Sequence, residues 1–109
     1  GAILYGSLEI GAVGGIVAVG LLAPAAAAEI SVAFKDGRRA EAGSLQERIA
    51  PVHNAIVGGM GVPGVKAALD LLGMKGGAPR PPLAPAPDSR VEEIRGILGT
   101  AHLLEGAPA

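Results

Sequence analysis

The chain contains no cysteine, no tryptophan and only two aromatic side chains, Tyr5 and Phe34. Without cysteine it can form neither disulfides nor thiolate metal sites, and a cysteine nucleophile is excluded. The scarcity of aromatic residues argues against the stacking surfaces that hold single-stranded nucleic acid. Nine basic and ten acidic residues give a formal net charge of −1, so the basic footprint of a nucleic-acid-binding protein is missing as well. The sequence therefore predicts no nucleic-acid partner.

Charged residues are also missing from the continuous run Ile10 to Ala28, which lies between Glu9 and Glu29. Its length is close to the roughly 20 residues that cross a bilayer, so a membrane anchor and a cleaved signal peptide are both considered. Glycines and a proline interrupt the run, and no basic residue precedes Lys35, whereas a signal peptide begins with basic residues. We expect no membrane insertion, and a membrane-anchored small protein is the least favoured alternative.

The hydrophobic pattern predicts a short helix, one short strand and then four helices. The expected helices cover residues 3–10, 24–35, 38–57 and 63–72, and the last one follows a cap at Asp88 or Ser89. Ser89 with Glu92 three residues later fits a capping box. Pro51 lies inside the third helix and should kink it. Residues 76–87 are rich in proline and have no periodic pattern, which predicts a stiff surface connector.

The expected strand, Ile16–Val19, is wholly apolar, as is typical of a parallel strand covered on both faces. A single strand can satisfy neither its backbone hydrogen bonds nor its two faces. It needs a sheet that this chain does not encode. The pattern therefore indicates that part of the fold is missing.

Several segments resemble, in order, the C-terminal end of the dihydrodipicolinate synthase and N-acetylneuraminate lyase family of class I aldolases. The matching segments are residues 4–16, Arg48-Ile49-Ala50-Pro51-Val52-His53-Asn54, Val65-Lys66-Ala67-Ala68-Leu69, Leu72-Gly73, Arg80-Pro81-Pro82-Leu83 and residues 88–104. They cover nearly the whole chain. The segments 61–66 and 76–80 favour members similar to 4-hydroxy-2-oxoglutarate aldolase.

The resemblance implies an α/β fold class, in which this chain is the C-terminal part of a (β/α)8 TIM barrel with a helical extension. Residues 1–36 would be the last barrel unit, made of a helix, the eighth strand and a helix. Residues 37–109 would be the C-terminal helical domain. The isolated chain is expected to be mostly helical.

The resemblance also implies the chemistry of the parent protein. Members of the family form a Schiff base between a lysine on the sixth strand and pyruvate, while a tyrosine relays protons. Both elements precede Gly1 in the family order, so we expect no catalytic residue here, and neither a metal nor a cofactor. Ile16, Val17 and Ala18 on the eighth strand would line the substrate pocket. Gly20-Leu21-Leu22 departs from the family, which usually has an asparagine shortly after this strand.

The implied parent is a cytoplasmic homo-oligomer, usually a tetramer, that acts on a pyruvate-type 2-oxo acid. The fragment itself would be inactive alone. Lys66 lies in an apolar helix but has no tyrosine at nearby spacing, so a structural role is expected rather than a Schiff base. Tyr5 is expected to pack, and His53 with His102 suggests no metal site. The alternative function is that of a standalone small helical interaction protein.

Overall fold

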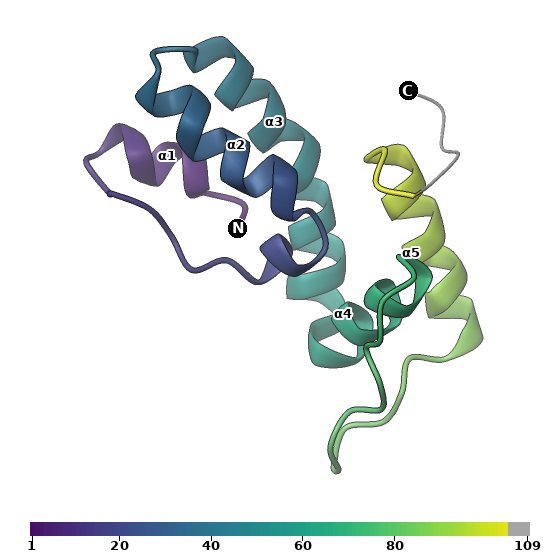
Figure 1. Ribbon diagram of the computed structural model, residues 1–109. Coiled ribbons are helices and arrows are strands. Elements are labelled where there is room, and N and C mark those ends of the chain that lie inside the picture. Colours follow the sequence, from purple (N-terminus) through teal and green to yellow (C-terminus); the bar gives the residue numbers. More distant parts are fainter. Residues whose placement is uncertain (105–109) are drawn as a thin grey trace. The chain divides into compact units, whose positions relative to one another are not determined.

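The computed structural model describes residues 1–104, which form helices joined by loops (Figure 1). In chain order these are α1 (Leu4–Glu9), the 3-10 helix η1 (Ala18–Leu21), α2 (Pro24–Lys35), α3 (Arg39–Val52), the π-helical turn η2 (His53–Gly58), α4 (Gly59–Leu71) and α5 (Asp88–Thr100). The chain divides into two compact units, Gly1–His53 and Asn54–Ala109. The boundary expected after residue 36 concerns the parts of a complete barrel, and it stays a prediction.

The first unit is built around the packing of α2 against α3. Ile30 and Ala33 of α2 and Ala42 and Ile49 of α3 are fully buried. Small alanines at such positions let two helix backbones approach closely, while the isoleucines fill the remaining volume. The helix predicted over 24–35 is confirmed, with Pro24 in its first turn. The short α1 packs on both α2 and α3.

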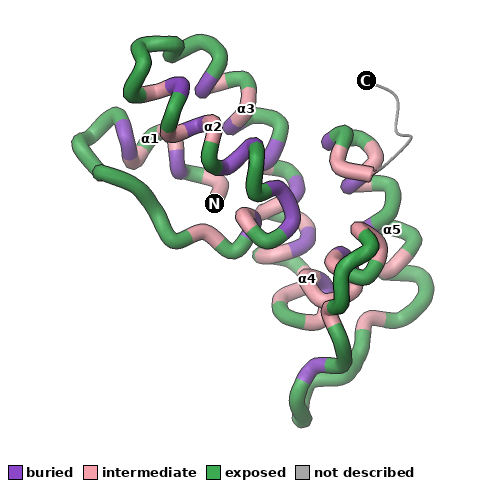
Figure 2. The backbone as a smooth tube through the Cα atoms, in the orientation of Figure 1, coloured by how far each residue is buried: buried purple, intermediate pink, exposed green. Residues whose placement is uncertain are grey.

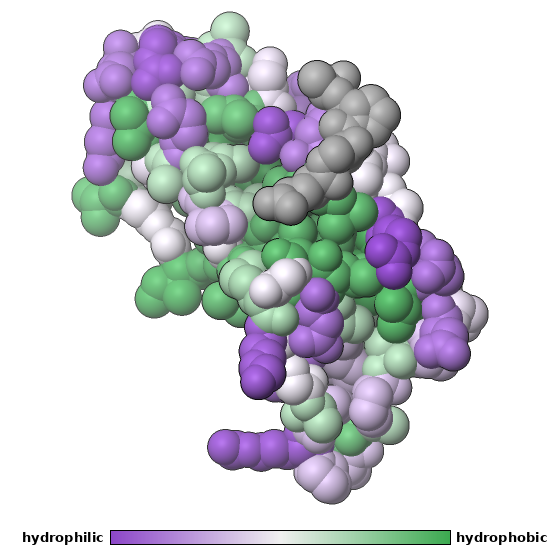
Figure 3. Space-filling view, turned by 45° about the vertical axis from the view of Figure 1, so that its right-hand side comes forward, coloured by the Kyte–Doolittle hydropathy of each residue, from purple (hydrophilic) through white to green (hydrophobic). Residues whose placement is uncertain are grey.

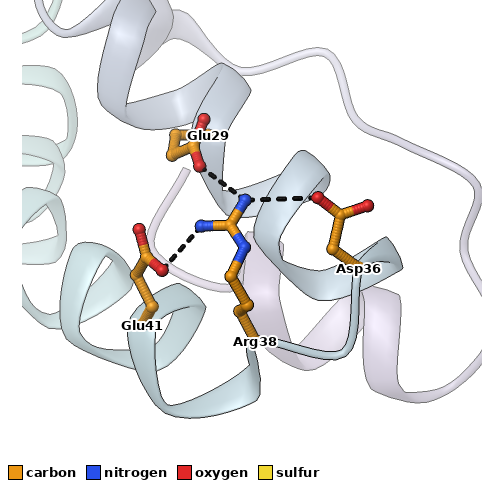
Figure 4. A network of polar contacts seen from close by, with 4 residues as sticks. All are labelled: Glu29, Asp36, Arg38 and Glu41. Carbon is orange, nitrogen blue, oxygen red and sulfur yellow. Dashed lines mark hydrogen bonds and ion pairs between the residues drawn. The ribbon is translucent and has the colours of Figure 1, made fainter.

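Arg38 organises the turn between α2 and α3 (Figure 4). Its guanidinium lies 2.9 Å from a carboxylate oxygen of Glu29, 3.3 Å from Asp36 and 2.6 Å from Glu41. These three carboxylates raise the pKa of Arg38 above its usual range. Because all four side chains are well exposed, the network fixes the geometry of the turn more than it adds to stability.

The strand expected over Ile16–Val19 is not formed in the described part of the chain, and this prediction is corrected here. Residues 12–17 lie outside the helices, Val17 has an extended backbone (φ −128°, ψ 120°), and Ala18 already begins η1. Among residues 1–104, no N–H group of residues 13–17 donates a backbone hydrogen bond. The physical reason is that a strand exists only through its neighbours, and residues 1–104 form no strand with which this segment could pair.

The uncharged run from Ile10 to Ala28 therefore covers the turn after α1, the extended segment, η1 and the start of α2. No helix in the described range 1–104 combines the length and the apolar character that a bilayer crossing requires. The run is interrupted at its glycines, as the sequence predicted.

The long helix predicted over 38–57 is observed as α3 followed by the π-helical turn η2. Pro51 lies in the last turn of α3, where its ring removes a backbone donor. A π-helical turn next to a proline is a common form of the kink that such a residue causes. The expected break at 58–61 is also present, because Gly61 has φ +64° and ψ −151° within α4.

In the second unit, α4 packs against α5. Ala68 of α4 and Ile94 and Leu98 of α5 are fully buried. The expected capping box of α5 is wrong, because the N-cap residue is Pro87 and no side chain bonds to the first turn. Ser89 is already the second helical residue, so its hydroxyl is not placed to act as an N-cap.

Candidate functional site

The three residues expected to line a substrate pocket lie at the junction between the extended segment and η1. Ile16 and Ala18 are exposed and Val17 is half-buried, whereas the next residue, Val19, is completely buried. Val19 therefore anchors this segment to the first unit, and the residues before it stand open. Figure 2 shows most of the stretch between α1 and η1 as exposed.

Large aliphatic side chains gather in this open part of the chain. Ile10 is 88% exposed, Val13 91% and Ile16 108%, and Ile3 at the start of α1 is 73% exposed. Hydrophobic residues also reach the surface on the face drawn in Figure 3. We call Ile10, Val13 and Ile16, together with the backbone of residues 12–17, the open segment. An extended backbone with free N–H groups and exposed aliphatic side chains is suited to pairing with another strand, and it supplies no catalytic group.

The stretch that follows the open segment is equally free of polar side chains. Leu22 is buried, and Leu21 is 56% exposed at the end of η1. From Ile10 to Ala28 the sequence carries no hydroxyl, amide or ionisable side chain. A polar substrate at this place would find hydrogen bonds only with the backbone.

Lys66 has a structural role, as the sequence analysis expected. Its Nζ donates a 2.8 Å hydrogen bond to the carbonyl oxygen of Gly76, and the N–H of Gly76 donates a 2.8 Å bond to Asp70 Oδ1. Two side chains of α4 thus hold the loop that follows Gly73 against the helix. This contact between helix and loop is the structural role that the structure gives Lys66.

We expect Lys66→Met to lower the free energy of unfolding by about 1–2 kcal/mol, because it leaves the Gly76 carbonyl without its charged donor. Lys75→Met is the matched control, since Lys75 is exposed and makes none of the described hydrogen bonds. Urea denaturation of the three proteins measures the difference. Equal stabilities for both variants would contradict the assigned role of Lys66.

Tyr5 packs against Phe34 rather than facing a site. The two rings meet edge to face, with centroids 5.7 Å apart. Desolvation, and after it the neighbouring Glu9 carboxylate, raise the pKa of the Tyr5 phenol. A phenol that holds its proton more tightly is a poorer proton relay, which agrees with the expected packing role.

His53, the first residue of η2, has a buried Nδ1 atom with no hydrogen-bond partner among the described residues. Desolvation lowers the pKa of its imidazole. The first unit therefore favours neutral His53. Nothing in the sequence pattern distinguished this histidine from the exposed His102.

The lowered pKa of His53 predicts a stability that depends on pH. The unfolded chain takes up a proton near the ordinary pKa of 6.5, before the folded chain does. The stabilisation is therefore complete above pH 6.5 and is lost progressively as the pH falls below it. Thermal unfolding between pH 7.5 and pH 5, values chosen to span that pKa, should show the decline. His53→Asn should remove this part of the decline and His102→Gln should leave it; a decline unchanged in His53→Asn would contradict the assignment.

No metal site emerges from residues 1–104. No group of three or more His, Cys, Asp or Glu side chains in the range 1–104 is placed to hold a metal ion. The second unit has a hollow of about 470 Å3, which the sequence analysis did not anticipate, lined by Leu71, Leu72, Gly73, Arg95, Leu103 and Leu104. Its lining offers one charged side chain, and nothing in it matches a catalytic arrangement.

Comparison with known proteins agrees with the resemblance seen in the sequence. The model of the dihydrodipicolinate synthetase family matches residues 2–101. The chain is 41% identical over 98 residues to 4-hydroxy-tetrahydrodipicolinate synthase from Gluconacetobacter diazotrophicus, covering 89% of this chain and 33% of that protein. It is 37% identical over 99 residues to the enzyme of the same name from Methanothrix thermoacetophila, covering 91% of this chain and 34% of that protein. The chain thus spans about a third of the length of these relatives.

Proposed function

The chain belongs to the dihydrodipicolinate synthetase family, and on that premise we propose that it is the C-terminal third of a pyruvate-dependent aldolase or lyase. The proposal is carried by one observation. The chain spans about a third of the length of its relatives, and the open segment stands unpaired at the place where the family resemblance puts the eighth barrel strand. The parent would make or break a carbon–carbon bond next to the carbonyl of a pyruvate-type 2-oxo acid.

In the proposed parent, a lysine outside this chain attacks the ketone carbon of pyruvate, and water leaves as the imine forms. The protonated imine withdraws electrons from the methyl carbon, which loses a proton and attacks the carbonyl carbon or imine carbon of the second substrate. This chain would contribute Ile16, Val17 and Ala18 as one wall of the pocket. Barrel sites lie at the C-terminal ends of the strands, where the open segment meets η1.

The proposal predicts that this chain forms no Schiff base of its own. Incubation with pyruvate and sodium borohydride, followed by mass spectrometry of the intact chain, should add no mass, because Lys66 is engaged with Gly76. A chimera in which the chain replaces the last third of the Gluconacetobacter enzyme should form the reduced adduct, on a peptide from outside this chain. An adduct on Lys66 would overturn the assignment.

The finer features of the parent remain part of the proposal. The two relatives carry the name 4-hydroxy-tetrahydrodipicolinate synthase. The segments 61–66 and 76–80 instead favour family members similar to 4-hydroxy-2-oxoglutarate aldolase. Gly20-Leu21-Leu22 lacks the asparagine that members usually have shortly after this strand, which argues against the family's ordinary substrate positioning in the parent. We also propose a cytoplasmic homo-oligomer for the parent.

The second candidate function is that of a small helical interaction protein. The observation that favours it is the exposed aliphatic group of Ile3, Ile10, Val13 and Ile16, which a partner protein would cover. Analytical ultracentrifugation separates the two candidates. A stable, monomeric chain with a cooperative unfolding transition favours the interaction protein, and concentration-dependent association through the open segment favours the barrel fragment.

A further inference from the structure

The hollow in the second unit lies where the helices α4 and α5 end. Its volume of about 470 Å3 falls within the range of roughly 300–1,000 Å3 that is typical of small-molecule sites. Four leucines line it, and all four are half-buried, so each keeps apolar surface that a ligand can cover. The described residues of the lining are Leu71, Leu72, Gly73, Arg95, Leu103 and Leu104.

The walls of the hollow are held by the hydrogen bonds that close each helix. Gly73 follows α4 with φ +80°, and the N–H of Met74 donates a 3.0 Å bond to the carbonyl oxygen of Leu69. After α5, His102 (φ +58°) and the N–H of Leu103 repeat this arrangement. Both ends are Schellman motifs, which fix the path of the chain beyond a helix. The leucines of the lining therefore lie on defined turns.

Arg95 brings one positive charge to this otherwise apolar lining. Its Nε lies 3.5 Å from Glu92 Oε1, whereas a charge-assisted hydrogen bond measures about 2.7–2.9 Å. Arg90, on the same helix, lies 2.8 Å from its own partner Glu93. Arg95 is therefore the less engaged of these two arginines, and its planar guanidinium can donate hydrogen bonds to another acceptor.

We propose that the hollow binds an aliphatic monocarboxylate, with its carboxylate on the Arg95 guanidinium and its hydrocarbon chain on the four leucines. A guanidinium matches a carboxylate through two parallel N–H···O bonds. The hydrocarbon chain removes leucine surface from water, which is favourable. This site does not depend on the proposed aldolase function, because its residues belong to the unit Asn54–Ala109 and the open segment belongs to Gly1–His53.

The two helix ends work against an anion, because the C-terminus of a helix carries a partial negative charge. At an exposed site each end weakens the binding of an anion by about two- to fivefold. One hydrogen bond between charged groups strengthens binding by about tenfold or more, and the guanidinium offers two of them. Arg95 therefore decides the charge preference of the hollow.

Titration of the methyl-labelled chain with sodium octanoate at neutral pH, followed by NMR, tests the site. We expect a Kd of about 1–10 mM, as is usual for a ligand of this size. The methyl signals of the four leucines should shift, and those of Ile10, Val13 and Ile16 in the open segment should not. Octanol and octylamine have the same chain without the carboxylate, and both should bind at least about tenfold more weakly.

Arg95→Met removes the guanidinium and keeps an unbranched side chain. It should weaken the binding of octanoate by about tenfold or more and leave the binding of octanol unchanged. Arg90→Met is the matched control, since Arg90 lies on the same helix but does not line the hollow. It should bind octanoate as the unchanged chain does.

Several results would overturn the proposal. They are unshifted leucine signals with octanoate, octanol or octylamine binding as tightly as octanoate, equal affinities in the two methionine variants, and shifts of similar size in the open segment. The comparison of the three ligands needs no variant, so it remains decisive if a substitution prevents folding. A failed borohydride experiment on the chimera would refute the aldolase proposal and leave these results unchanged.

Discussion

Gly76→Ala is expected to lower the free energy of unfolding by about 3 kcal/mol, the largest stability effect that the structure predicts for a single methyl group. A Cβ atom at this position would lie 2.0 Å from the carbonyl oxygen of Lys66 and 2.7 Å from its carbonyl carbon. These atoms belong to the backbone of α4, so no rotamer change relieves the collision. The loop would have to leave the helix, and both bonds that Lys66 and Asp70 make to Gly76 would be lost.

Gly96→Ala is the matched control for this experiment. Gly96 lies in α5 of the same unit, and a Cβ atom added there meets nothing within 4 Å. Since alanine favours a helix over glycine, Gly96→Ala should raise stability by about 0.5–1 kcal/mol. Urea denaturation of both variants gives the comparison. A Gly76→Ala protein as stable as the unchanged chain would show that the loop does not lie on α4 as described.

Ile16→Asp should have little effect on the isolated chain and a large effect on the chimera with the Gluconacetobacter enzyme. In the isolated chain Ile16 is fully exposed, so we expect a change in stability below about 0.5 kcal/mol. In a closed barrel the same side chain would be covered on a packed face. A buried carboxylate without a partner costs about 3–5 kcal/mol, which corresponds to a loss of borohydride-trapped adduct of roughly 100-fold or more.

Ile16→Val is the control, because valine keeps the β-branched shape and removes a single methyl group. It should leave trapping in the chimera within about threefold of the unchanged sequence. Equal trapping by the aspartate and valine variants would show that the open segment is not a covered strand of the barrel. Mass spectrometry measures the trapped adduct in each chimera, and the amount of soluble protein recovered measures how well that chimera folds.

The helices were largely predictable because their signals are local. Pro24 marks the start of α2, Gly73 follows the end of α4 with φ +80°, and the buried Ile94 and Leu98 of α5 follow helical spacing. The cap of α5 was not predictable in the same way. Ser89 and Glu92 fit the pattern, but the preceding Pro87 takes the N-cap position and places Ser89 inside the helix.

The open segment shows why the rest could not be read from this chain alone. Ile16–Val19 has the composition of a buried strand, but a strand forms only where a neighbouring strand is present, and residues 1–104 supply none. Conversely, the buried Gln46 bonds to the main chain of Gly1 and Tyr5, more than 40 positions away in the sequence. Neither hydrophobic periodicity nor a local motif predicts a contact between residues so far apart in the sequence. The family resemblance predicts Ile16, Val17 and Ala18 as pocket residues. The structure places them where the open segment meets η1, and their role in a pocket stays a prediction.

The central claim, that this chain is the last third of a Schiff-base aldolase, is tested most directly by reading the coding DNA upstream of Gly1. The account predicts an open frame that continues for roughly 200 residues, enough to complete a barrel of typical length. That region should encode a lysine at the end of a predicted sixth strand and a tyrosine that can serve it as a proton relay. A start codon within a few residues of Gly1, with no barrel sequence before it, would contradict the account.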